Sequence, residues 1–322
     1  MKTVPILAAA IILGLMSVLG LDSTSQLALA QSPTVSSVSR SRGGARPMTI
    51  PISIRVKGVK PEPELQMIDL TVTEDGDPQT VLSIRAIGTN SSLTLAVLIQ
   101  DDLVSSIGNE IKPLAQFITR LPRGSRVLVG YLRTGSLQVR QKFTPDLEKA
   151  AKALRPPLGV ESAAPYNPYV EVVEAIRRFD SQPSGRRAIL LVSDGLDLSH
   201  GRDSSSAGQS LDLQRAITEA QRRSIAVYGF YAPTVGGRDS ILRANAQGSL
   251  LRLAEETGGR AFFQGTGAPV SFDPFIKELT SSLDRQIALT YLSTHTEKGF
   301  HRIRVRSLST GVEIDHPAGY TR

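Results

Sequence analysis

Two apolar runs of this chain each end in acidic and hydroxyl side chains. The run 93–99 is followed closely by Asp101 and Asp102. Hydroxyl groups come next, at Ser105 and Ser106. A strand that is apolar on both faces is typical of the buried middle of a parallel sheet. Polar side chains at the carboxyl end of such a strand lie where open α/β sheets bind their ligands. They could coordinate a cation or contact a partner.

The second apolar run repeats this arrangement almost a hundred residues later. Residues 188–192 are apolar, and Ser193, Asp194 and Gly195 follow them. The carboxyl ends of parallel strands meet at one sheet edge, so Asp194 is expected to face the acids of the first run. Hard divalent cations such as Mg²⁺ prefer oxygen ligands and keep some of their waters. Carboxylates and hydroxyls gathered at this edge could supply such ligands.

Alternating strand and helix patterns must position these residues. Between 89 and 285, short apolar runs alternate with segments of helical periodicity such as 107–121 and 211–223. This alternation predicts an α/β fold, a Rossmann-like open and mainly parallel sheet with helices on both faces. Residues 48–88 read as strands with a tight turn, and 286–322 again alternate as strands. We expect these two segments to form a small β unit beside the sheet.

The first thirty residues have the pattern of a secretory signal peptide. Lys2 precedes an apolar stretch, and Ala28-Leu29-Ala30 is a small-x-small site, so cleavage is expected between Ala30 and Gln31. Residues 31–47 then read as a disordered leader rich in Ser, Arg and Gly. The prediction is a secreted or periplasmic protein without a stable membrane span after cleavage. The alternative is a signal anchor that stays in the membrane.

Composition excludes several classes of function. The chain of 322 residues has no cysteine, so it has no disulfide, thiolate metal site or cysteine nucleophile. Its net charge is +7, but the basic residues are spread along the chain, and basic and aromatic residues do not alternate in any block. We therefore expect no nucleic-acid binding. Arg186 and Arg187 precede the second apolar run, where they are expected to cover the end of the sheet rather than bind an anion.

No familiar catalytic motif is present. Gly-x-Ser-x-Gly, the phosphate-binding Gly-x-x-x-x-Gly-Lys and His-Glu-x-x-His are all missing. Of the four histidines, His200 lies in a polar loop and the others lie in the C-terminal strands: His295, His301 and His316. No general base is evident beside the acids. The sequence therefore predicts a protein that is not an enzyme.

Several motifs resemble the von Willebrand factor type A (VWA) domain. They are the order of the elements, the apolar strand that leads to Asp101, and Leu-Leu-Val-Ser-Asp-Gly at 190–195. The residues Asp-Leu-Thr-Val-Thr-Glu-Asp-Gly-Asp-Pro-Gln-Thr at 69–80 are similar to a hairpin that precedes this domain in a secreted bacterial, VWFA-related (acidobacterial-type) subfamily. Pro-Ala-Gly-Tyr at 317–320 resembles the C-terminal ending of that subfamily. The resemblance covers about residues 48–322.

The resemblance implies a metal-ion-dependent adhesion site. The residues that match its ligands are Asp101, Ser105 and Asp194, and the metal would be Mg²⁺ or Mn²⁺. The threonine of the family is absent from its loop, where Ser162 or Asn167 could substitute.

The first motif of the adhesion site also departs from the family. Leu103 replaces the first serine when the alignment starts at Asp101. Starting at Asp102 instead places Val104 at that position and Ser106 at the second serine. The loss of oxygen ligands leaves open a degenerate site that binds no metal, in which the acids cap the following helix.

The leading hypothesis is a secreted, non-enzymatic interaction or adhesion module with a degenerate metal site. Its partner would be a protein or another envelope component. The partner-binding face is predicted at the strand ends and comprises Asp102, Tyr166, Asn167 and Asp197. Two alternatives are a metal-assisted hydrolase that uses the same acids and a structural component of the envelope.

Overall fold

The computed structural model describes residues 44–56, 70–88, 91–237, 239–265 and 267–322. They belong to one compact unit. The predicted signal peptide with its cleavage site, and the predicted leader up to residue 43, lie outside the described residues. The last residues of that leader are described, and Arg46 and Pro47 already belong to the first strand.

One sheet has six strands in the order β6-β5-β4-β7-β8-β9. The strands are β4 (Leu93–Gln100), β5 (Arg126–Arg133), β6 (Ser136–Thr144), β7 (Arg186–Ser193), β8 (Ile225–Tyr231) and β9 (Ala261–Phe262). All neighbours pair in parallel except β5 and β6, which are antiparallel. Thr134 and Gly135 join β5 to β6 with positive φ angles of 48° and 75°. This is the backbone conformation of a tight hairpin turn, and it makes the sheet mixed.

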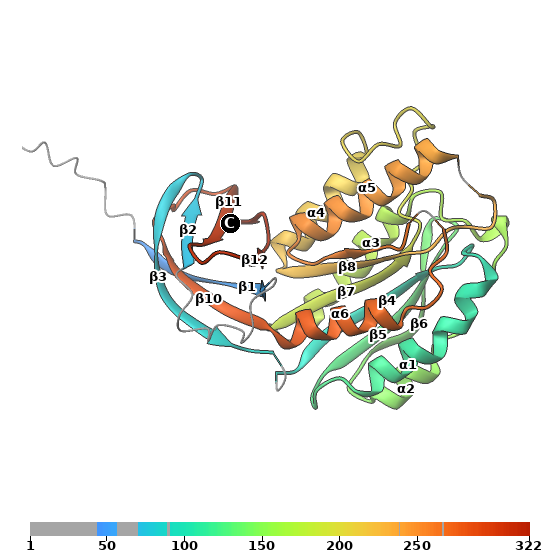
Figure 1. Cartoon of the computed structure of the whole chain (residues 1–322), viewed down its shortest axis with the longest axis horizontal. Coiled ribbons are helices and arrows are strands. Elements are labelled where there is room, and N and C mark those ends of the chain that lie inside the picture. Colours follow the sequence, from blue (N-terminus) through green and yellow to red (C-terminus); the bar gives the residue numbers. More distant parts are fainter. Residues whose placement is uncertain (1–43, 57–69, 89–90, 238, 266) are drawn as a thin grey trace, which may run out of the picture. The chain divides into compact units, whose positions relative to one another are not determined.

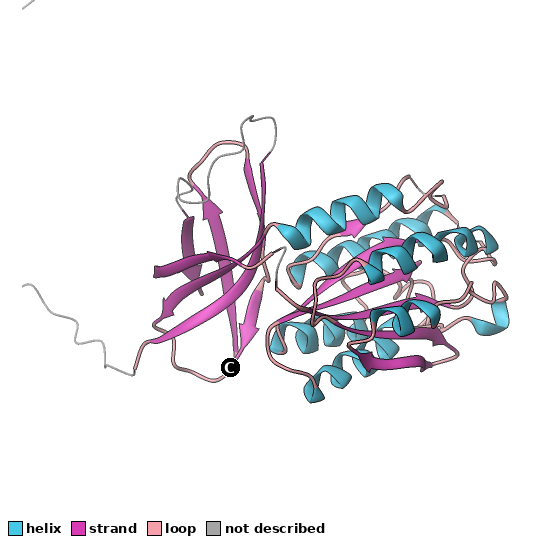
Figure 2. Cartoon of the chain, turned by 90° about the horizontal axis from the view of Figure 1, so that it is seen from below, coloured by secondary structure: helices cyan, strands magenta, loops and turns pink. Residues whose placement is uncertain are grey.

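Helices cover both faces of this sheet (Figure 2). They are α1 (Ile111–Thr119), α2 (Leu147–Lys152), α3 (Pro168–Arg177), α4 (Leu211–Arg222), α5 (Ser240–Glu256) and α6 (Asp273–Asp284). Side chains alternate between the faces of a strand. Leu95 and Val97 of β4 therefore share a core with α1, α2 and α6, while Ala96 and Leu98 share another with α3, α4 and α5.

A second sheet has seven strands in the order β12-β1-β10-β3-β2-β11-β13 (Figure 1). The strands are β1 (Arg46–Val56), β2 (Leu70–Glu74), β3 (Asp77–Ala86), β10 (Gln286–Ser293), β11 (Phe300–Ser307), β12 (Val312–Asp315) and β13 (Gly319–Thr321). Every pair in it is antiparallel. Alternate residues such as Ile50, Ile52 and Leu289 form its own apolar core.

The predicted fold class is therefore wrong. The larger sheet is the seven-stranded antiparallel one, so the main sheet is not the open, mainly parallel sheet that was predicted. The sheet built from 93–262 is the smaller one and is mixed. The strands at the two chain ends do pair with one another, but the sheet that they form has seven strands and is not a small appended unit. Each of these segments is short in the sequence, and their pairing joins residues more than two hundred positions apart, such as Ile50 with Leu289. Local sequence patterns do not show how many of these segments join one sheet.

Candidate functional site

The carboxyl ends of β4 and β7 lie side by side, and one buried glutamine connects them. The Gln100 amide donates a hydrogen bond to Asp102 Oδ1 at 2.8 Å. Its carbonyl oxygen accepts hydrogen bonds from Ser193 Oγ at 2.5 Å and from the Asp194 N–H at 3.2 Å. All four side chains are buried. Buried polar groups hold a fixed geometry when they are hydrogen-bonded, so this network fixes Asp102 and Asp194 at one sheet edge.

Asp101 points to a different partner. Its side chain is fully buried, and the Arg155 guanidinium binds both carboxylate oxygens, at 2.7 and 2.8 Å. The Leu158 N–H donates to Oδ1 as well, at 3.0 Å. Arg155 also lies over the ring of Tyr131, 4.0 Å from the centroid. The hydrogen bond to Asp101 outweighs burial and raises the pKa of Arg155, so this guanidinium stays charged. Asp101 thus has a cation already.

Ser105 is exposed at the start of the short 3-10 helix η2 (Ser105–Glu110). The residue that precedes η2, Val104, makes no capping hydrogen bond with its side chain, and neither does Glu110 before α1. The alternative in which Asp101 and Asp102 cap the following helix stays a prediction. The contacts that define these two acids are the ion pair of Asp101 with Arg155 and the hydrogen bond from Gln100 to Asp102. Their use as metal ligands stays a prediction.

A cavity of about 190 Å³ opens at this sheet edge. Its walls come from the ends of β4 and β7 and from the loops beside them: Gln100, Asp102, Glu161, Ala164, Pro165, Tyr166, Asp194, Leu196, Leu198 and Gly236. Three of these residues are acidic and none is basic. The cavity is therefore a small, partly apolar pocket with three acidic side chains in its wall.

The rim of this acidic cavity is accessible to a partner. Glu161 lies exposed on the 3-10 helix η3 (Glu161–Ala163). Tyr166 is 68% exposed and has a positive φ of 60°, an uncommon conformation for a side chain of its size. A Cβ atom on Gly236 would come within 2.8 Å of the Glu161 carboxylate, so glycine allows close approach there. Aromatic residues such as this exposed tyrosine are enriched at protein–protein interfaces.

Asn167 and Asp197 are buried below this rim. Asn167 is the N-cap of α3, where it accepts from the Tyr169 N–H, and its amide donates to Asp212 at 2.6 Å. Asp197 accepts from Ser210 Oγ at 2.6 Å, and Ser210 is the N-cap of α4. Both side chains therefore anchor the loop after β7 to two helix starts. Their predicted contact with a partner stays a prediction.

The cavity does not fit the metal that the VWA resemblance implies. Within the described ranges, no three His, Cys, Asp or Glu side chains are grouped so that they could hold a metal ion. Of the predicted ligands, only Asp194 lines the cavity. Asp101 is bound by Arg155 and Ser105 is exposed. The donor set of the adhesion site is therefore not assembled.

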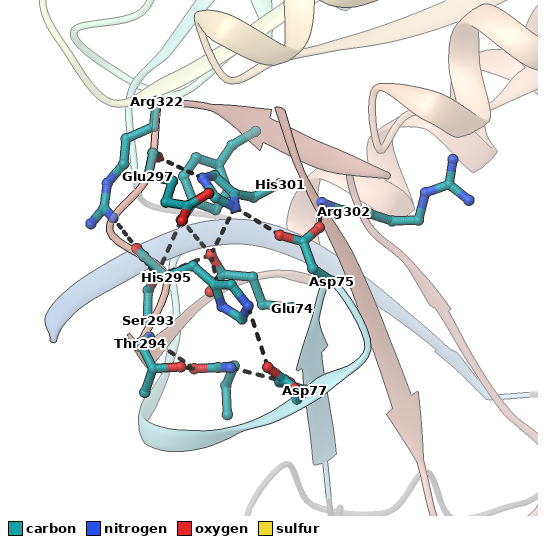
Figure 3. A network of polar contacts seen from close by, with 12 residues as sticks. Glu74, Asp75, Asp77, Ser293, Thr294, His295, Glu297, His301, Arg302 and Arg322 are labelled. Carbon is teal, nitrogen blue, oxygen red and sulfur yellow. Dashed lines mark hydrogen bonds and ion pairs between the residues drawn. The ribbon is translucent and has the colours of Figure 1, made fainter. Parts of the chain in front are cut away.

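A second polar network joins the β2–β3 turn to the C-terminal strands (Figure 3). Glu74 is fully buried, and its Oε1 accepts hydrogen bonds from Ser293 Oγ at 3.0 Å and Tyr320 OH at 2.6 Å. The nearest nitrogens of His295 and His301 are 3.9 and 3.8 Å from the same oxygen. The network therefore places two imidazoles close to a buried carboxylate.

His301 carries a positive charge in this network. Its Nδ1 is 2.8 Å from Asp75 Oδ2 and its Nε2 is 2.9 Å from the Glu297 carbonyl oxygen. Both partners accept hydrogen bonds, so both ring nitrogens must carry hydrogen. Burial lowers the pKa of His301, but the hydrogen bonds to Glu297 and Asp75 outweigh it and raise that pKa above its usual value.

The structure thus brings together three of the predicted residues and separates the others. Asp102, Tyr166 and Asp194 line one cavity. Sequence reasoning missed Gln100, which connects the strand ends, and Arg155, which binds Asp101. The only signal for Gln100 was its polarity at the end of an apolar strand, and nothing local links Arg155 to an acid 54 positions earlier.

No protein-family model matches the chain, and no curated protein is similar to it. Solved structures with some likeness include an aerotolerance-related membrane protein from Bacteroides fragilis, 14% identical with a TM-score of 0.42, over 60% of this chain and 99% of that one. Others are BatB from Bacteroides thetaiotaomicron (14%, TM-score 0.39, 59% and 96%) and the VWA domain of SpRpn10 (14%, TM-score 0.34, 60% and 93%). At these TM-scores the likenesses assign neither a family nor an activity.

In the part of the chain that the structure describes, no helix is both long and apolar enough to cross a membrane.

Proposed function

We propose that the chain is a secreted or periplasmic, non-enzymatic interaction module of VWA type, and that its acidic cavity receives a cationic side chain of a protein partner. One observation carries the proposal: three carboxylates and no basic group line a cavity whose rim presents an exposed tyrosine. Low dielectric around buried acids strengthens their attraction for a cation. The ring of Tyr166 could add a cation–π contact.

The size of the cavity favours a single side chain as the occupant. About 190 Å³ is below the 300–1,000 Å³ that is typical of pockets for drug-sized ligands. An arginine side chain combines an apolar stem with a charged, planar head, and it suits a pocket that has leucines as well as acids in its wall. We therefore propose arginine as the group that the cavity receives.

The proposed binding does not need a metal ion. Asp101, the first ligand of the implied adhesion site, is held by Arg155. Leu103 is buried where that site needs a hydroxyl. In this proposal the cationic group of the partner takes the role that a metal has in the VWA resemblance. If Mg²⁺ or Mn²⁺ were found to bind Asp102 and Asp194, a metal site would replace this proposal.

The cavity wall also supports a role other than catalysis. None of its ten residues is a histidine, serine, threonine, cysteine or lysine. Acids alone could act on a bound water, but general acid–base catalysis needs a positioned partner with a suitable pKa. The metal-assisted hydrolase is therefore not supported by these side chains.

The test is calorimetric titration of residues 31–322 with Nα-acetyl-arginine amide. We expect saturable binding that is lost with the citrulline analogue, which has the same shape but no charge. Glu161→Gln should weaken binding about three- to tenfold, because it removes one charge at the rim. Glu161 is exposed, so the variant is expected to fold.

Glu148→Gln is the matched control, because Glu148 is an exposed acid on α2 outside the cavity wall. It should leave the affinity unchanged. Equal binding of the arginine and citrulline probes would sink the proposal, and so would an equal loss of affinity in Glu148→Gln.

A further inference from the structure

A second cleft, of about 620 Å³, has the opposite charge. Five of its fourteen lining residues are arginines, and none is acidic. The arginines converge from three places in the chain: Arg85 on β3, Arg186 and Arg187 at the start of β7, and Arg222 and Arg223 at the end of α4. Such a concentration of positive charge in a concave site raises the local concentration of anions.

One of these arginines, Arg186, uses four of its five N–H donors within the fold. Arg186 donates hydrogen bonds to the carbonyl oxygens of Gly88, Ser91 and Leu283, at 2.7 to 2.8 Å, and to Gln286 Oε1 at 2.8 Å. It therefore covers the end of the sheet, as the sequence indicated. None of these acceptors is a carboxylate, so its positive charge is not neutralised by them.

Other arginines keep donors that can reach a ligand. Arg85 is exposed, and among the described residues it forms no ion pair. Arg187 donates to the carbonyl oxygens of Gln182 and Pro183 only. Arg222 is exposed, and its contact with Glu219 is long, at 3.4 Å. These three guanidinium groups are available to the cleft.

Arg223 is the most nearly neutralised of the five. It is paired with Asp180 at 2.7 Å and with Glu219 at 2.5 Å. In the described part of the chain, Asp180 and Glu219 are the two acids that pair with arginines of the cleft. They compensate two of five positive charges. The cleft therefore keeps an excess of positive charge.

We propose that this cleft binds an anion with two or more phosphate groups. Guanidinium groups bind phosphate oxygens through pairs of hydrogen bonds, and the hydroxyls of Ser184 and Ser224, which also line the cleft, add further donors. Arginines that reach the cleft from three elements can contact separate phosphates at the same time. A single orthophosphate would fill only a small part of the volume.

This phosphate site is separate from the acidic cavity. Arg187 lies at the amino end of β7, and Asp194 follows the carboxyl end of the same strand. The two sites thus lie at opposite edges of one sheet. Because no residue lines both of them, the phosphate site can exist whether or not the acidic cavity binds a cationic partner.

The experiment is calorimetric titration with pyrophosphate and with orthophosphate at low ionic strength. We expect pyrophosphate to bind more tightly. The double variant R85Q/R222Q should weaken pyrophosphate binding at least about tenfold, because it removes charges from two sides of the cleft. Both arginines are exposed, so thermal unfolding should be unchanged; R85Q alone should show a smaller loss.

R140Q is the matched control, because Arg140 is exposed on β6 and lies outside the cleft. Its affinity for pyrophosphate should equal that of the wild type. Vesicles of phosphatidylcholine with and without cardiolipin, whose headgroup carries two phosphates, distinguish a lipid source from a soluble one. The proposal is overturned if neither pyrophosphate nor cardiolipin binds, or if R140Q weakens binding as much as R85Q/R222Q.

Discussion

The ion pair between Asp101 and Arg155 determines which acids face the cavity. Asp101 follows the apolar strand β4 directly and is fully buried, so it needs a partner that compensates its charge. Arg155 supplies two parallel hydrogen bonds, the geometry in which guanidinium binds carboxylate best. The neighbouring Asp102 instead accepts a hydrogen bond from Gln100 and lines the cavity.

Arg155→Met should destabilise the fold by about 3 kcal/mol, because it leaves a buried carboxylate without its cation. Urea unfolding of the variant and the wild type measures this loss. Arg178→Met is the matched control, since Arg178 pairs with Glu174 on the surface and such pairs contribute about 0.5 kcal/mol. Similar losses in both variants would contradict the role given to Arg155.

Glu171 of α3 is a buried acid of another kind. Burial raises its pKa to about 8, and the N–H groups of Arg133 and Gly135 in the β5–β6 turn offset this only in part. The folded protein therefore holds a proton that the unfolded chain releases above a pH of about 4.5. The stability of the wild type should fall as the pH rises from about 4.5 to 8.

Glu171→Gln removes this proton release while keeping nearly the same shape. We expect the variant to match the wild type near pH 4.5 and to exceed its free energy of unfolding by a few kcal/mol at pH 8.5. Chemical unfolding across this pH range gives the difference. Glu148→Gln on the surface of α2 should show no such trend. A difference that is constant with pH would mean that Glu171 does not stay protonated.

Among the elements, β11 is held to the β2–β3 turn by charged side chains as well as by its strand pairing. His301 at its start contacts Asp75 in the turn, and the Arg302 N–H donates to the same carboxylate at 2.7 Å. Glu74, His295 and Tyr320 surround the imidazole from β2, the segment after β10 and β13. The positive charge on His301 therefore stabilises the meeting point of these strands.

His301→Gln should lose stability in a pH-dependent way. The folded pKa of His301 is raised above the unfolded value of about 6.5, so its contribution is fully present below that pH. It is lost as the pH rises through the folded pKa. We expect the variant to be less stable by about 1 kcal/mol at pH 5.5 and closer to the wild type at pH 9. His200→Gln, in an exposed loop, is the control. A larger deficit at pH 9 would contradict the charged state.

For the whole molecule, local sequence patterns indicated the elements better than their assembly. The apolar runs before Asp101 and before Asp194 are strands, and their acidic ends do meet at one sheet edge. The sheet that the two ends of the chain form was expected only as a small unit, because no local pattern shows that seven strands pair across more than two hundred positions. Arg155 was missed for the same reason: its partner is distant in sequence, and only the folded chain brings the two charges together.

The central claim is that the acidic cavity binds a cationic side chain without a metal ion. The most direct measurement is the titration of residues 31–322 with Nα-acetyl-arginine amide, once in EDTA and once in Mg²⁺. The account predicts the same saturable binding in both conditions. Binding that occurs only in Mg²⁺, and disappears in Asp194→Ala, would contradict the claim and restore the metal-dependent adhesion site.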